Sequence, residues 1–225
     1  MIDLSLIWIV IIGIGVLIYV ILDGFDLGIG ILFPFVKDCH ERDVMMNTVA
    51  PVWDGNETWM VLGGAALYAA FPVVYSVVLS ALYMPIILML IALIFRGVAF
   101  EFRFKANKTK KLWDKAFIYG SILASFFQGV ILGAYIQGIK TVNGVYAGGG
   151  LDWLTLFSVF TGIGVVILYA ALGCGWLIFK TDAELQDQMY ALMPKLIIAV
   201  FIVFGLVSIY TPLAHPEIAA RWFTQ

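Results

Sequence analysis

The sequence has 225 residues, of which 63% are hydrophobic and 12% are charged, with a formal net charge of −2. Soluble globular domains usually carry about 45–50% apolar and about 25% charged residues, so this composition excludes an ordinary water-soluble domain. The apolar runs lack the polar repeat of a surface helix and the strict alternation of a membrane-spanning barrel strand. The sequence therefore predicts an all-α integral membrane protein.

Six apolar runs predict six transmembrane helices within a single membrane domain, residues 1–225. Each run approaches or exceeds the roughly 20 residues that a helix needs to cross a bilayer. We expect the spans at about 4–36, 51–70, 73–95, 116–137, 154–179 and 196–212. The first run has no Lys or Arg before it and no cleavage site after it, so we expect it to remain as a helix rather than a signal peptide. Pro34 disfavours helix at the preceding residue and marks a candidate end of this first span.

The basic residues predict the orientation in the membrane. Cytoplasmic loops of membrane proteins carry an excess of Lys and Arg. The segment around the third loop holds seven of the thirteen basic residues, namely Arg96, Arg103, Lys105, Lys108, Lys110, Lys111 and Lys115. This loop is therefore predicted to be cytoplasmic, which places the N-terminus and the C-terminal end outside. We interpret the basic segment as a topology signal and expect no nucleic-acid partner.

Carboxylates within the first two spans are the candidate functional groups. Asp23 and Asp26 lie in DGFDLGIG (23–30), and Asp54 and Glu57 lie in the second span. A spacing of three residues places each pair on one face of its helix. An ionisable side chain at the centre of a span costs about 2.5–3.5 kcal/mol, so such residues are functional candidates by default.

A fifth carboxylate, Glu101, lies just beyond the third span on the same predicted side, and Arg96 and Arg103 lie close enough to pair with some of the five. Burial favours the neutral form of a carboxyl group, so such groups can take up and release protons near neutral pH. Three interpretations stay open: a proton or ion path, a site for another transported solute, or polar groups that fix helix packing.

Other polar residues give weaker signals. His40 and His215 are expected in loops on opposite sides of the membrane, so we predict no metal site, and Cys39 and Cys174 give no disulfide framework. Gln128 and Gln137 in the fourth span are expected to form hydrogen bonds between helices.

Three segments, in this order and at this spacing, carry a family resemblance. DGFDLGIG (23–30), APVWDGNETW (50–59) and FRGVAFEFR (95–103) closely resemble subunit II of cytochrome bd-type quinol oxidases, including the cyanide-insensitive branch. The resemblance implies a non-haem, multi-pass subunit of a terminal oxidase in the bacterial cytoplasmic membrane. That enzyme oxidises quinol and reduces oxygen to water.

The resemblance also implies partners and cofactors. The two b-type haems and the d-type haem are expected in a partner, subunit I, together with the quinol site, and this chain is expected to bind no haem through its own ligands. Small single-span accessory subunits, membrane lipid and a structural quinone or lipid are further expected partners. Because family members are longer, we expect this chain to represent the first part of the family fold.

Carried over onto this sequence, the resemblance orders the candidate residues. Asp54 is the first choice for a carrier of protons from the cytoplasm, followed by Asp23 and Asp26, and Glu101 matches a position that is usually acidic. Glu57 occupies a position that varies in the family pattern.

Supporting residues surround these carriers. Trp53 and Asn56 are expected to orient Asp54, and Arg96 and Arg103 are expected to support the carboxylates. A proton path and support of subunit I assembly are therefore the expected roles. The alternative is a stand-alone proton-coupled transporter or ion channel with an intramembrane carboxylate site.

Overall fold

The computed structural model describes residues 3–214 and 216–223. His215, one of the two histidines, lies outside the described residues. The chain is almost entirely helical, with one short hairpin. The elements are α1 (Leu4–Leu32), a 3-10 turn (Phe33–Phe35), α2 (Cys39–Val49), α3 (Trp53–Ala70), α4 (Pro72–Arg103), α5 (Lys110–Ile136), β1 (Thr141–Val142), β2 (Val145–Tyr146), α6 (Leu156–Lys180), α7 (Ala183–Ala214) and α8 (Pro216–Phe223).

Five helices in the described part of the chain are long and apolar enough to cross a membrane, which confirms the all-α membrane fold. They are Leu4–Phe35, Pro72–Arg103, Lys110–Ile136, Leu156–Lys180 and Ala183–Ala214. The predicted second span is also helical, as α3, but it is not among these five. Its 18 residues cover about 27 Å at 1.5 Å per residue, and its first turns are polar. That α3 crosses the membrane stays a prediction.

The ends of the helices differ from the predicted spans at the charged end of the bundle. α1 ends at Leu32, and Pro34 lies within the 3-10 turn that follows it. The segment after it, expected to be a loop containing Cys39 and His40, forms α2. Asp38 caps this helix by accepting a hydrogen bond from the backbone N–H of Glu41 at 2.9 Å, a contact that satisfies a free donor of the first turn.

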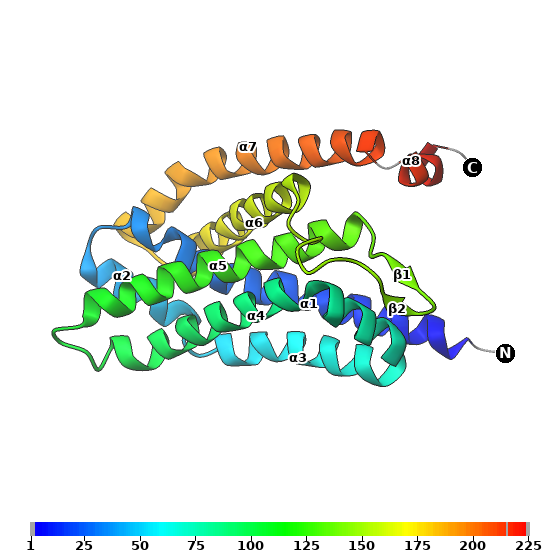
Figure 1. Ribbon diagram of the computed structural model, residues 1–225. Coiled ribbons are helices and arrows are strands. Elements are labelled where there is room, and N and C mark those ends of the chain that lie inside the picture. The colour runs from blue at the N-terminus through cyan, green and yellow to red at the C-terminus, as the bar shows by residue number, and fades with distance from the viewer. Residues whose placement is uncertain (1–2, 215, 224–225) are drawn as a thin grey trace.

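The long helices form a bundle in which α1 is central (Figure 1). It packs against α3, α5 and α6, while α4 packs along α5, and α7 packs on α6. One end of the bundle carries α2, the connection between α4 and α5, and the connection between α6 and α7. The N-terminus, the junction of α3 with α4 and the hairpin lie at the other end. The predicted cytoplasmic connections thus share one end, and its sidedness stays a prediction.

Small residues allow α1 to lie close to its neighbours. A Cβ atom on Gly28 would overlap the backbone carbonyl of Tyr169 in α6, and a Cβ atom on Gly173 would overlap the backbone of α1 at Gly28. The two helix backbones are therefore in direct contact, which is the packing that small residues permit in membranes. This contact fixes the depth at which Asp23 and Asp26 lie.

We expect Gly28→Val to destabilise the bundle strongly. The added side chain meets backbone, which cannot rotate away, so the loss should exceed the about 1–3 kcal/mol typical of overpacking. Thermal unfolding of the detergent-solubilised protein, followed by far-UV circular dichroism, measures the change. Gly205→Ala is the matched control, because no atom lies within 4 Å of a Cβ at that position. Equal melting temperatures for the two variants would contradict the close α1–α6 contact.

Candidate functional site

Arg96 is the centre of a buried cluster of ionisable side chains from three helices. Its Nη1 lies 3.2 Å from Oδ1 of Asp23, and its Nη2 lies 3.7 Å from Oδ2 of Asp26, both on α1. The same Nη1 donates a hydrogen bond to Oε1 of Glu57 on α3. Asn56, the residue before Glu57, donates from Nδ2 to Oδ2 of Asp26 at 2.8 Å. We call these five residues the Arg96 cluster.

The Arg96 cluster is almost completely shielded by the protein. The side chains of Arg96 and Asp26 are 0% exposed and that of Asp23 is 1% exposed, whereas that of Glu57 is 22% exposed. Asp23 interacts with Tyr19 as well as with Arg96, whereas Oδ1 of Asp26 and Nε and Nη2 of Arg96 have no hydrogen-bond partner among the described residues. Buried polar atoms are usually paired, so this cluster retains bonding capacity that a purely structural ion pair would have used.

Local sequence explains how the helices present these groups. The three-residue spacing of Asp23 and Asp26 turns both carboxylates towards α4. On the other side, Trp53 stacks on Phe100 with ring centroids 4.9 Å apart. The guanidinium of Arg96 lies 5.6 Å from the Trp53 ring centre and 5.5 Å from that of Phe100, positions that allow cation–π attraction. Aromatic packing therefore fixes the arginine in place.

The predicted residues do not all gather at this site. Asp23, Asp26, Glu57, Asn56 and Arg96 converge, as the preceding distances show. Asp54, by contrast, is exposed on the outer side of α3. Asn56 donates to Asp26 and Trp53 stacks on Phe100, so the expectation that these two residues orient Asp54 does not describe their contacts.

Two further predicted residues lie apart from the Arg96 cluster. Glu101 is 67% exposed and pairs with Lys105 one turn later, at 3.2 Å. Arg103 is buried but pairs with Asp43 and Asp114, which the sequence did not single out. The expectation that Arg103 pairs with one of the five named carboxylates is therefore wrong. The reason is that α2 and α5 supply acidic partners much closer to it.

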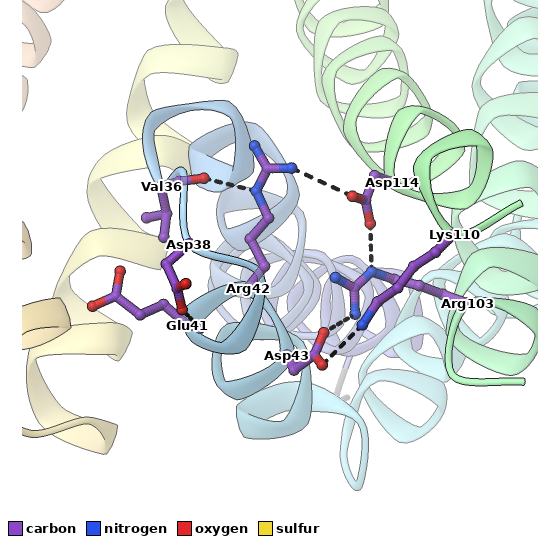
Figure 2. A network of polar contacts seen from close by, with 8 residues as sticks. All are labelled: Val36, Asp38, Glu41, Arg42, Asp43, Arg103, Lys110 and Asp114. Atoms are coloured by element: carbon purple, nitrogen blue, oxygen red, sulfur yellow. Dashed lines mark hydrogen bonds and ion pairs between the residues drawn. The ribbon is translucent and has the colours of Figure 1, made fainter. Parts of the chain in front are cut away.

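A second charged network lies at the end of the bundle that carries α2 (Figure 2). Arg103 on α4 lies 2.5 Å from Asp114 on α5 through Nε and 2.5 Å from Asp43 on α2 through Nη1. Lys110 contacts Asp43 at 2.9 Å, and Arg42 contacts Asp114 at 3.3 Å. These pairs join α2 to the consecutive helices α4 and α5, across 60 residues of sequence between Asp43 and Arg103.

Asp43 is held in its charged form by this network. Partial burial raises the pKa of Asp43, but hydrogen bonds from Lys110 and Arg103 outweigh that effect and hold the pKa below its usual value of 3.8. Arg42 also donates from Nε to the backbone carbonyl of Val36, in the connection that leads into α2, at 2.7 Å. The contacts identify this network as a clamp on α2, α4 and α5.

A third polar group connects α1, α5 and α6 deeper in the bundle. Gln128 donates from Nε2 to the hydroxyl of Tyr19 at 2.6 Å and accepts a hydrogen bond from the hydroxyl of Tyr169 at 2.7 Å. Tyr19 lies one turn before Asp23 and interacts with it. The predicted role of Gln128 between helices is thus confirmed. Gln137, at the end of α5, similarly accepts from the Thr155 hydroxyl that caps α6.

The arrangement favours proton chemistry at the Arg96 cluster. One guanidinium faces three carboxyl groups, so complete ionisation would leave two uncompensated negative charges in a shielded site. Such charges are costly unless protons neutralise them. Among the described residues, no group of three or more His, Cys, Asp or Glu side chains is placed to hold a metal ion. The three carboxyl groups of the cluster thus outnumber the single cation that they share.

The lowered pKa of Asp43 predicts acid sensitivity. A carboxyl group with a depressed folded-state pKa stabilises the protein above its unfolded-state pKa, and this contribution is lost as pH falls through the folded-state value. We expect Asp43→Asn to lower the melting temperature near neutral pH. The difference from the parent should shrink below pH 3.8, the usual value for this group. A difference that stays constant with pH would contradict the ionic role of Asp43.

Removal of Arg96 should be more damaging than removal of an exposed charge. Arg96→Gln leaves Asp23 and Asp26 buried without their cation, and breaking a buried ion pair in this way usually costs about 3–5 kcal/mol. Thermal unfolding measures the loss. Lys105→Gln is the control, because its pair with Glu101 is exposed and contributes little. Equal stability of the two variants would show that Arg96 does not hold the three helices together.

Comparisons with known proteins match this chain over nearly its whole length. The family model described as cytochrome bd terminal oxidase subunit II matches residues 4–224. Cytochrome bd ubiquinol oxidase subunit 2 of Bacillus subtilis (strain 168) is 33% identical over 200 residues, which are 87% of this chain and 59% of the relative. Cytochrome bd-I ubiquinol oxidase subunit 2 of Escherichia coli (strain K12) is 32% identical over 215 residues, covering 92% of this chain and 57% of the relative.

The chain therefore spans a little under 60% of the length of these relatives. The similarity includes all three helices that build the Arg96 cluster, since the matched range extends from α1 to α8. Together with five helices of membrane-spanning length, it establishes a multi-pass bacterial membrane protein. The chain belongs to the cytochrome bd terminal oxidase subunit II family.

Proposed function

We propose that this chain is a non-haem membrane subunit of a bd-type quinol oxidase, and that its carboxylates conduct protons from the cytoplasm towards the site where oxygen is reduced to water. The relatives are named as subunits of cytochrome bd ubiquinol oxidases, which supports the assignment to such a complex. The haems and the quinol site belong, in this proposal, to a partner subunit I.

The observation that carries the proton path is the charge balance at Arg96. Asp23 and Asp26 contact one guanidinium that also binds Glu57, and Oδ1 of Asp26 has no hydrogen-bond partner among the described residues. A site meant only to join helices gains most when every buried polar group is satisfied. A site that exchanges protons needs a free acceptor, and Oδ1 of Asp26 is one.

Asp54 extends the proposed path to the surface of α3. It lies on the exposed side of that helix, one turn before Glu57, and the two carboxylates interact electrostatically. In this proposal a proton moves between Asp54, Glu57 and the two aspartates of α1. Glu101 is exposed at the same end of the bundle, paired with Lys105, and its membership of the path stays a prediction.

A partner is also supported by the uncovered apolar surface. The most apolar stretch of α7 has no buried residue within the described chain, and the first half of α1 is largely exposed. Lipid, subunit I and single-span accessory subunits are the proposed neighbours. A structural quinone or lipid in such a surface would fit its apolar character.

Asp26→Asn in the complete complex tests the proposal. The amide can still accept a hydrogen bond from Asn56 but cannot take up a proton. We expect quinol-driven oxygen consumption to fall by roughly 100-fold or more, the usual contribution of a positioned proton-transfer group. The visible haem absorbance of the same membranes should be unchanged, and Asp54→Asn should behave in the same direction.

Other outcomes separate the alternatives. Loss of the haems together with activity would assign Asp26 to assembly rather than to proton transfer. Parental activity in both variants would remove the carboxylates from the path. A purified complex without haem absorbance that moves a solute in vesicles would favour the transporter interpretation.

A further inference from the structure

We propose that protons reach the buried carboxylates from the side of the bundle, through Glu57 on α3. In this proposal, protons cannot reach them along the bundle axis from its α2 end. This inference rests on the proposed proton path. It identifies Glu57 as the residue through which that path reaches the surface.

Packed aromatic rings fill the bundle between the Arg96 cluster and the α2 end. Phe117 lies edge-on to Phe33, with centroids 5.0 Å apart, and edge-on to Phe100, at 5.2 Å. All three rings are buried. Beyond them α2 adds further fully buried apolar side chains, namely Met45, Met46 and Val49. Among the described residues, these rings and apolar side chains carry no group that binds a proton.

Positive charge beside the Phe33 ring also opposes the entry of protons along this route. The Arg103 guanidinium is 0% exposed and lies 5.2 Å from the centre of the Phe33 ring. Arg42 lies 5.4 Å from the same ring. Arg42, Arg103 and Lys110 outnumber their partners Asp43 and Asp114, so the network keeps one net positive charge. That charge opposes the approach of a hydronium ion along this route, because little water screens it.

Glu57 is the one carboxylate of the Arg96 cluster with contact to the surface. Its side chain is 22% exposed, against 1% for Asp23 and 0% for Asp26. Asp54 is exposed one turn earlier on the same helix. The charged groups that face Glu57 are Asp54 from its own helix, Arg96 from α4 and the aspartates of α1.

Glu57 at the surface and Asp23 in the interior both contact Arg96, so the charge of one affects the other. Nη1 of Arg96 binds Glu57 and also lies 3.2 Å from Asp23, so the two carboxylates share one nitrogen of the guanidinium. A proton that binds Glu57 removes its negative charge and leaves the guanidinium to Asp23 and Asp26. When that proton then moves from the Glu57 carboxyl to one of the aspartates, Glu57 regains its charge and its pair with Arg96. One O–H bond breaks and one forms, and the total charge is unchanged.

Glu57→Gln in the complete complex tests this assignment. The amide oxygen can still accept from Arg96, but the group cannot carry a proton. We expect oxygen consumption to fall by roughly tenfold or more with intact haem absorbance, and the solvent deuterium isotope effect to increase, because proton transfer becomes rate-limiting. Glu57→Asp should recover a large part of the rate. Asp187→Asn is the matched control, because Asp187 is exposed near the same end and has no ion pair or hydrogen bond among the described residues.

The outcomes distinguish this inference from the proposed function. A parental rate and isotope effect in Glu57→Gln, with Asp26→Asn inactive, would overturn the side opening and leave the proton path intact. Parental behaviour in both variants would overturn the path itself. If Glu57→Gln loses its haems, Glu57→Asp decides: a slower rate and a larger isotope effect with intact haems support the role of Glu57, and parental values refute it.

Discussion

The fold depends on one guanidinium placed among three carboxyl groups inside a membrane protein. Arg96 has no exposed surface, and it contacts Asp23 and Asp26 from α1 and Glu57 from α3. Removing these charges from water is expensive, and only their mutual attraction and the surrounding rings offset that cost. The close contact of α1 with α6 at Gly28 brings the aspartates to the correct depth. Packing of four helices thus converges on a single ion-pair centre.

Arg96 and Arg103 both lie on α4, but the networks around them differ in charge balance. In the clamp near α2, three cations meet two carboxylates, so each acid is fully compensated. At Arg96 one cation meets three carboxylates, and Oδ1 of Asp26 has no hydrogen-bond partner among the described residues. Arg96 and Arg103 are two turns apart on one helix, so a single element supports both the balanced network and the unbalanced one. We infer that excess negative charge inside attracts protons, while the clamp keeps the helices aligned.

The sequence predicted the helices and most members of the site, but not their pairing. Apolar runs were sufficient to locate the long helices, and three-residue spacing located the acidic pairs. They could not set the rotation of α3, which depends on packing of Trp53 against Phe100, and that rotation turns Glu57 towards Arg96 while Asp54 faces outwards. Sequence spacing also could not predict the partners of Arg103, since Asp43 lies 60 residues away along the chain.

The exposed side of α3 has a physical consequence for what surrounds it. A carboxylate facing lipid chains would cost about 2.5–3.5 kcal/mol at the centre of a span. Asp54 carries that charge outwards and Glu57 is partly exposed beside it, so hydrocarbon is a poor neighbour for this part of α3. A polar surface of subunit I, or water at the membrane boundary, removes the cost in both cases. In the proposed path, Asp54 and Glu57 therefore also define the face of α3 on which a protein partner would receive or supply the proton.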